Sequence, residues 1–266
     1  MKQDKKHYFT IRGRLFLAGI IIIAFGLTRL DQGRYVGPIE IYESQLKKEE
    51  NNPKAILKLA NAYYNKAIHL TSEQESLQLL DGAILLYEKA LSIRKDPKTF
   101  YLLGQAYFKI AKFSDEKDSL YKKAEDSFKS AEKEGFRKKE MFLYLGHILL
   151  LRGALDDSLL YYRKALDFSP KDPIILYNIG YLFYEKGDLD TALLYLVKIG
   201  KGSLPEDMKI NIHLLLAKIY EKKKDLVVAR EEYRKVLSKE KTNFEAREAL
   251  NRISATKVPN EKKRKR

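Results

Sequence analysis

The chain has 266 residues, no cysteine and a formal net charge of +15 at pH 7. Without cysteine, these residues form no disulfide, no thiolate metal site, no cysteine nucleophile and no lipidated N-terminal cysteine. The length and the hydrophobic content of 45% allow one elongated domain with a sizeable core.

Most of the net charge lies at the two ends of the sequence. Residues 1–34 carry seven basic and two acidic side chains, and residues 255–266 carry six and one, so each end contributes +5. The 220 residues between them hold 38 basic and 33 acidic side chains. This balance does not indicate the basic face that nucleic-acid binding requires, and we expect no nucleic-acid partner.

Residues 1–14 form a basic leader, followed by the thirteen uncharged residues Leu15–Leu27. This order is typical of a secretory signal. We predict a membrane segment over residues 15–30, with Leu15–Leu30 in contact with the lipid bilayer. The excess of basic charge before it predicts a single pass with the leader in the cytoplasm and the remaining chain outside, in the periplasm of a Gram-negative bacterium. The basic side chains of the leader are Lys2, Lys5, Lys6, Arg12 and Arg14.

Two alternatives to an uncleaved signal-anchor stay open, because thirteen helical residues rise only about 20 Å against a hydrocarbon core of about 30 Å. One is a signal peptide cleaved at Ala24-Phe25-Gly26, and the other is a buried helix of the fold. The signal-anchor is favoured because the following residues, Leu-Thr-Arg-Leu-Asp-Gln, lack an obvious small-x-small cleavage site. Residues 31–52 then hold a polar linker and a first helix, which begins at Pro38 and runs through Leu46.

From residue 53 on, the sequence repeats itself, most clearly in Phe142–Pro170 and Leu176–Pro205. Gly146 and Gly180 are 34 residues apart, and so are Gly153 and Gly187. Each stretch reads as two apolar helices around a Gly and an acidic turn. A helix–turn–helix unit of this length cannot bury its own apolar face, so we expect the units to stack on one another.

The residues of the unit in Phe142–Pro170 have specific predicted roles. Gly146, in the middle of the first helix, is expected to let the second helix approach closely, and Gly153 to end the first helix in a left-handed conformation. Asp156 or Asp157 is expected to cap the second helix. That helix then presents a small residue, a large aromatic residue and a small residue, followed by proline: Ser158, Tyr162, Ala165 and Pro170.

This pattern resembles the tetratricopeptide repeat (TPR) family, in particular its membrane-anchored bacterial type. The resemblance implies an all-α solenoid of helix–turn–helix units. We divide residues 53–243 into five units, 53–96, 97–138, 139–172, 173–209 and 210–243. About a dozen extra residues, His69–Leu80, interrupt the first unit, and eight extra residues lie in the second.

After the repeats, residues 244–254 are predicted to form a capping helix whose Phe244, Ala249 and Leu250 cover the last unit. Residues 255–266 are a basic tail that lacks apolar periodicity and is predicted to be disordered. We interpret its cluster Lys262–Arg266 as a solvated end. The alternatives are a tether to anionic lipid and, in a eukaryote, a nuclear import signal, against which the apolar leader argues.

No catalytic or metal-binding pattern is present in the sequence. Its four histidines, His7, His69, His147 and His213, have no second ligand at the spacing of the HExxH motif. Gly200-Lys201-Gly202-Ser203 lacks the residue order of a phosphate-binding loop. We therefore expect no enzyme activity, no metal and no cofactor.

The resemblance to TPR proteins further implies a concave groove, lined by the first helix of each unit, that holds a peptide or a partner helix. We predict the groove positions as the face of each first helix that is offset by one residue from its core face. In the fifth unit these positions are Leu214, Lys218 and Glu221. Packing between units is the alternative role of the aromatic positions. The predicted partner-binding residues are Asn61, Tyr64, Tyr101, Phe108, His147, Tyr177, Tyr181 and Tyr184.

The predicted function is that of a non-catalytic scaffold of the bacterial cell envelope, which binds a protein partner in this aromatic groove. One alternative is a self-associating structural protein, a homo-oligomer whose groove takes the Ile39–Leu46 helix or the tail of another copy. Another is an accessory subunit of an envelope enzyme or secretion complex.

Overall fold

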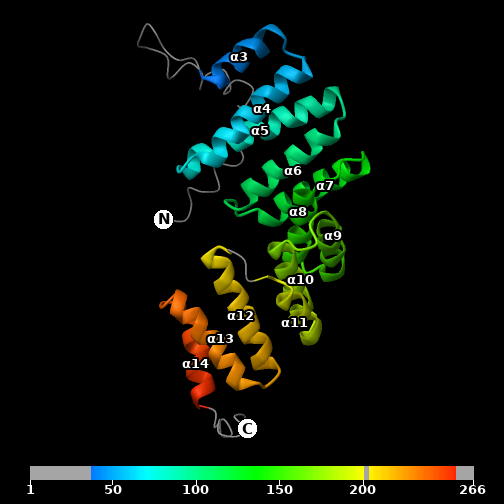
Figure 1. The fold of residues 1–266 in the computed structure, drawn as a ribbon. Coiled ribbons are helices and arrows are strands. Elements are labelled where there is room, and N and C mark those ends of the chain that lie inside the picture. Colours follow the sequence, from blue (N-terminus) through cyan, green and yellow to red (C-terminus); the bar gives the residue numbers. More distant parts are fainter. Residues whose placement is uncertain (1–36, 201–203, 256–266) are drawn as a thin grey trace.

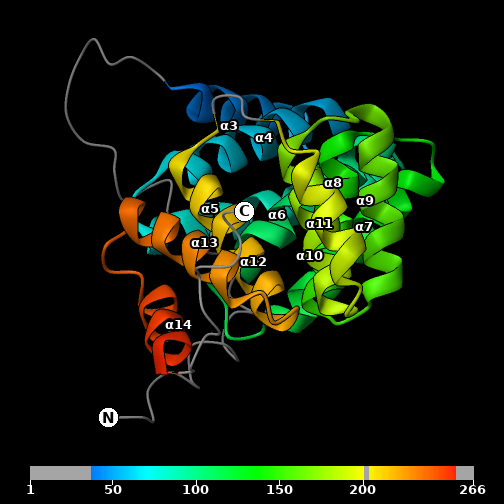
Figure 2. The ribbon, with the colours of Figure 1, turned by 60° about the horizontal axis from the view of Figure 1, so that its bottom comes forward.

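The computed structural model describes residues 37–200 and 204–255, which form twelve α-helices (Figure 1). Consecutive helices pack against each other in pairs, and successive pairs stack along a curved path (Figure 2). The helices are α3 Pro38–Lys48, α4 Pro53–His69, α5 Glu73–Ile93, α6 Pro97–Ala111, α7 Lys117–Lys133, α8 Lys139–Leu151, α9 Leu155–Phe168, α10 Pro173–Glu185, α11 Leu189–Val197, α12 Glu206–Lys222, α13 Leu226–Lys239 and α14 Phe244–Ala255.

Three of the first helices begin with the same local chemistry. At α4, α6 and α10, an Asn or Asp side chain accepts a hydrogen bond from a backbone N–H of the first turn, over 2.8 to 3.0 Å. Proline follows directly, and its fixed φ and missing N–H suit the first helical position. The capping residues are Asn52, Asp96 and Asp172, and the prolines are Pro53, Pro97 and Pro173.

The turns inside the third and fourth units each contain a glycine in the left-handed conformation. Gly153 and Gly187 have φ of 74° and 82°, so the predicted role of Gly153 is confirmed. The prediction that Asp156 or Asp157 caps the second helix is wrong, because α9 begins one residue earlier, after Ala154, and both carboxylates fall in its first turn. There they still favour the positive end of the helix. Asp156 instead forms an ion pair with Lys186 of the next unit.

Glycine allows the two helices of a unit to approach closely. A Cβ placed on Gly146 would lie 2.9 Å from the Tyr162 ring of α9, and a Cβ on Gly104 would lie 2.7 Å from the Phe128 ring of α7. These separations are far below van der Waals contact, so the prediction made for Gly146 is confirmed. Packing thus offsets the cost of about 1 kcal/mol that glycine carries inside a helix.

The extra residues of the first unit lengthen its helices instead of forming a loop. Helix α4 has 17 residues and α5 has 21, and only residues 70–72 separate them. The corresponding helices of the third unit, α8 and α9, have 13 and 14 residues. Helix α5 packs along most of its length, because its buried residues extend from Ser76 near its start to Ala90 near its end.

The described residues form one continuous core from α4 to α10 and a separate core among α12, α13 and α14. A small cluster around Ala192, Leu196, Leu215 and Ile219 lies between them. Helix α14 covers the second core with Ala246, Ala249 and Ile253, all at most 1% exposed. The prediction that Phe244 also covers the last unit is wrong, because its side chain is 76% exposed.

Within residues 37–200 and 204–255, no helix is long and apolar enough to span a bilayer. The membrane segment predicted at residues 15–30 lies outside the described residues, and so does the basic tail after Ala255.

Candidate partner-binding surface

Three of the predicted groove residues belong to the core. Tyr64, Tyr101 and Phe108 are 8%, 5% and 4% exposed, so they offer almost no surface to a partner. Neighbouring rings cover the face that was expected to be open. Tyr144 of α8 packs on Phe108 with ring centroids 4.8 Å apart, and Phe136, which follows α7, packs on Tyr101 at 5.0 Å. For Phe108, packing between units is the role that the geometry favours, because Tyr144 belongs to the third unit. Tyr101 packs within its own unit, and Tyr64 is buried in the main core.

Asn61 and His147 keep part of their surface but are engaged inside the molecule. The Asn61 amide oxygen accepts a hydrogen bond of 2.7 Å from the Tyr87 hydroxyl of α5. The His147 ring lies edge-on to Phe108, with centroids 5.8 Å apart. Burial and the nearby Lys112 charge lower the pKa of His147, so its imidazole is neutral at pH 7.

The three tyrosines of α10 lie at the junction of the fourth and fifth units. Tyr177, Tyr181 and Tyr184 are partly buried, and all three pack against the small cluster between the two cores. Burial, followed by the hydrogen bond and charge of Glu185, raises the pKa of Tyr181 to about 12. At neutral pH its hydroxyl therefore stays protonated and is able to donate a hydrogen bond.

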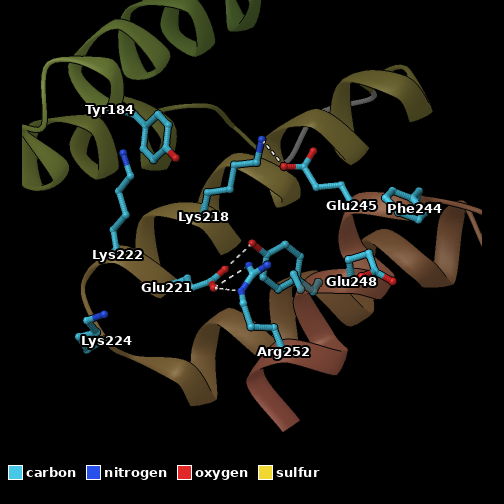
Figure 3. A pocket seen from close by; sticks show the side chains of 11 residues that line it. Tyr184, Lys218, Glu221, Lys222, Lys224, Phe244, Glu245, Glu248 and Arg252 are labelled. Carbon is cyan, nitrogen blue, oxygen red and sulfur yellow. Dashed lines mark hydrogen bonds and ion pairs between the residues drawn. The ribbon is translucent and has the colours of Figure 1, made fainter. Parts of the chain in front are cut away.

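The cleft that adjoins this junction has a volume of about 580 Å³. Tyr184 of α10 lies on one side, Phe244 at the start of α14 on the other, and α12 runs between them (Figure 3). We call this site the C-terminal cleft. Of the eight predicted partner-binding residues, Tyr184 lines this cleft, together with Lys218 and Glu221, two of the groove positions predicted for the fifth unit.

Ion pairs hold two walls of the C-terminal cleft in place. Lys218 of α12 pairs with Glu245 of α14 over 2.6 Å. Arg252 of α14 donates from Nε and Nη2 to the same Glu221 oxygen, over 3.0 and 2.7 Å. The Tyr233 hydroxyl donates to the other oxygen of Glu221 over 2.8 Å. These contacts tie α12, α13 and α14 together around the opening (Figure 3).

Two further lysines of the cleft have no acidic partner among the described residues. The Lys222 ammonium lies 3.9 Å from the centroid of the Tyr184 ring, a cation–π distance. Lys224 stands in the turn after α12 with φ of 64°, at the place that Gly153 and Gly187 occupy in earlier units. A left-handed conformation costs a non-glycine residue roughly 1 kcal/mol, yet the turn carries a lysine here.

The sequence did not point to α14 as part of a site. Phe244 is predicted to pack on the last unit, but it lies two residues before Ala246, about 200° round the helix, on the side away from the buried face. Its side chain is therefore exposed and lines the cleft. In the described segments, no group of three His, Cys, Asp or Glu side chains is arranged to hold a metal ion.

Comparison with known proteins finds a family model that matches part of the repeats. Residues 146–192 match the sequence model described as TPR repeat. The BBSome complex member BBS4 from Bos taurus is 29% identical over 116 residues, which are 43% of this chain and 21% of that protein. The match thus spans about a fifth of the length of that relative.

Three solved structures share the fold. YrrB, described as a TPR protein with an unusual peptide-binding site, aligns with a TM-score of 0.63 and 20% identity over 80% of this chain and 99% of its own. PilF of Pseudomonas aeruginosa aligns with a TM-score of 0.55 and 15% identity over 80% and 95%. The Cut9–Hcn1 structure of the APC/C aligns with a TM-score of 0.53 and 14% identity over 81% and 38%. The described chain therefore has the fold of an all-α TPR solenoid.

Proposed function

We propose that this TPR solenoid is a non-catalytic scaffold that binds a peptide or helix of a partner protein at its C-terminal cleft. A TPR fold by itself implies a protein-interaction scaffold. The proposal adds the place on the solenoid at which the partner binds. The fold similarity to YrrB, which is described as having a peptide-binding site, supports a peptide as the bound form.

The observation that carries the proposal is the C-terminal cleft itself. Its volume of about 580 Å³ is within the range of ligand-binding pockets, and its walls combine aromatic rings with charged groups. Internal ion pairs order these walls before a partner arrives, which lowers the entropy lost on binding. Aromatic and cationic side chains of this kind are enriched where proteins bind one another.

We further propose that the scaffold acts in the bacterial cell envelope. The support is the basic leader and the uncharged run Leu15–Leu27, which would anchor the chain through residues 15–30 with the repeats outside the cytoplasm. Mass spectrometry of the full-length protein purified from native membranes tests this. Recovery of the intact leader is expected, whereas a chain that starts near Leu27 would mean cleavage.

Site-specific photo-crosslinking tests the binding site. A photoreactive phenylalanine analogue replaces Tyr184 in the full-length protein, expressed in its native cells. The matched control carries the analogue at Leu194 of α11, which is 62% exposed and does not line the cleft. We expect a crosslinked partner from position 184 and none from position 194.

Other results would contradict the proposal. Equal crosslinking at both positions would remove the cleft from the binding site. Crosslinks only to other copies of the chain would favour the self-associating structural protein. Recovery of an enzyme at a fixed stoichiometry would favour the accessory subunit.

A further inference from the structure

We infer that the C-terminal cleft recognises an acidic peptide segment that carries an aromatic or large aliphatic anchor residue. The inference rests on the proposed function and specifies the chemistry of the partner. Lys222 and Lys224 would bind carboxylates of the segment. The rings of Tyr184 and Phe244 would contact its apolar anchor residue.

The charges of the cleft favour an acidic ligand over a basic one. Glu245 is paired with Lys218, and Glu221 is paired with Arg252. The remaining carboxylate, Glu248, lies close enough to Arg252 to contribute to its raised pKa. Two of the three acidic groups are therefore already neutralised by neighbours, and the four basic side chains of the lining leave the cleft with an excess of one positive charge. In contrast, Lys222 and Lys224 have no carboxylate within ion-pair distance in the described part of the chain, so an incoming carboxylate gains new ion pairs.

The apolar groups of the cleft favour a ligand with a hydrophobic anchor. The Phe244 side chain is 76% exposed, although it begins a helix whose next buried residues are packed in the core. Tyr184 faces the opening with Lys222 stacked on its ring (Figure 3). An aromatic or aliphatic side chain inserted between α10 and α14 would cover Phe244 and exclude water from the cation–π pair.

The charge of the chain argues against its own tail as the occupant. Residues 256–266 follow α14 directly and carry six basic side chains and one acidic side chain. Their charge has the same sign as Lys222 and Lys224, so they would repel the unpaired cations of the cleft. The occupant with complementary charge is a segment of another protein.

Fluorescence anisotropy with the full-length protein in detergent tests this inference. The probe is a fluorescein-labelled peptide, Glu-Asp-Glu-Phe-Asp-Glu, with an amidated C-terminus, so that only side-chain carboxylates are available. Two matched peptides carry serine in place of phenylalanine, or lysine in place of every acidic residue. We expect the acidic probe to bind, the serine peptide to bind more weakly and the lysine peptide not to bind.

Three variants locate the binding in the cleft. Lys222→Glu reverses one unpaired charge and is expected to weaken binding of the acidic probe about tenfold, because a favourable ion pair becomes a repulsion. Lys224→Gly removes the second charge and restores the residue that earlier turns use, so it should weaken binding several-fold without lowering the melting temperature. Lys171→Glu alters an exposed lysine outside the cleft and should leave binding unchanged.

The inference is overturned if the lysine peptide binds as well as the acidic probe, or if Lys222→Glu and Lys224→Gly behave like Lys171→Glu. Photo-crosslinking at position 184 separates this failure from failure of the proposed function. A partner crosslinked at 184 without binding of the acidic probe would retain the scaffold and reject the acidic ligand. No crosslink and no probe binding would reject both.

Discussion

At the scale of single residues, glycine and its aromatic neighbour determine how closely the helices of a unit pack. Gly146→Ala places a methyl group 2.9 Å from the Tyr162 ring, which is fully buried and has no free space to move into. Strain from overpacking outweighs the gain in helix propensity, and we expect a loss of about 1–2 kcal/mol in the free energy of unfolding.

Urea denaturation followed by circular dichroism measures this loss. Gly200→Ala is the matched control, because no atom lies within 4 Å of the position where its Cβ would be. An equal effect of the two substitutions would show that the close approach at Gly146 does not contribute to stability.

A buried carboxylate makes the stability of the second and third units depend on pH. Glu125 of α7 is 2% exposed and pairs with Lys129 over 2.6 Å and with Arg152 of α8. Burial acts to raise its pKa, but the Lys129 hydrogen bond and the charges of Lys129, Lys122 and Arg152 outweigh it, so the pKa lies below the usual 4.5. The stabilisation is therefore present above pH 4.5 and is lost as the pH falls through the lower pKa of the folded state.

We expect Glu125→Gln to lower the stability at pH 7 by on the order of 1–2 kcal/mol, because it leaves partly exposed cations without their acceptor. The difference in melting temperature between the variant and the natural sequence should shrink as the pH is lowered below 4.5. A difference that stays constant with pH would mean that the charge of Glu125 is not the cause.

At the scale of elements, α14 has a buried face that closes the solenoid and an exposed end that lines a cleft. Ile253→Ala deletes a side chain that is 1% exposed in the C-terminal core, and we expect a loss of about 2–4 kcal/mol. Phe244→Ser changes a side chain of the same helix that is 76% exposed, so the loss should be within about 0.5 kcal/mol.

Thermal unfolding of both variants compares the two ends of the helix. A large loss from Phe244→Ser would mean that Phe244 packs on the protein in solution, which would also remove it from the proposed anchor site. Binding of the acidic probe to the same variant reports its role in the cleft separately from stability.

The elements also show how a repeat accommodates extra residues. The insertion in the first unit is absorbed by two longer helices, because added turns gain backbone hydrogen bonds and packing that a loop would not supply. The sequence indicated where the extra residues were but not which structure they take, since that depends on the neighbouring helix against which they pack.

At the scale of the whole molecule, similar ion pairs join the third unit to the fourth and the fourth to the fifth. Lys186 with Asp156, and Lys223 with Asp190, connect successive turns, and Lys239 with Glu206 joins α13 to α12 over 2.8 Å. Surface pairs of this kind contribute only about 0–1 kcal/mol each. The separate apolar cores therefore account for most of the stability and divide the chain into two parts.

Native-state hydrogen exchange tests this division. In a solenoid each unit contacts only its neighbours, so a local loss of stability should spread little. We expect Ile253→Ala to speed amide exchange in α12, α13 and α14 while leaving α6 to α9 nearly unchanged. Equal acceleration throughout would mean that the described chain unfolds as a single cooperative unit.

The sequence by itself determined the class of fold, because the 34-residue spacing of glycines and the small–aromatic–small–proline pattern are local requirements of a stacked helical unit. The left-handed turn at Gly153 and the close approach at Gly146 follow from the same local rules. These features depend on residues near one another in the chain. They can be recognised in the sequence because the same pattern recurs in successive units.

Only the tertiary structure decided which surface is open. The groove positions were predicted in the same way for every unit, one residue after the core positions of the first helix. Tyr64 and Phe108 are nevertheless buried, Phe108 beneath the Tyr144 ring of the next unit, whereas Tyr184 lies at a cleft. Exposure depends on which side chains arrive from the next helix pair and on where the stack ends.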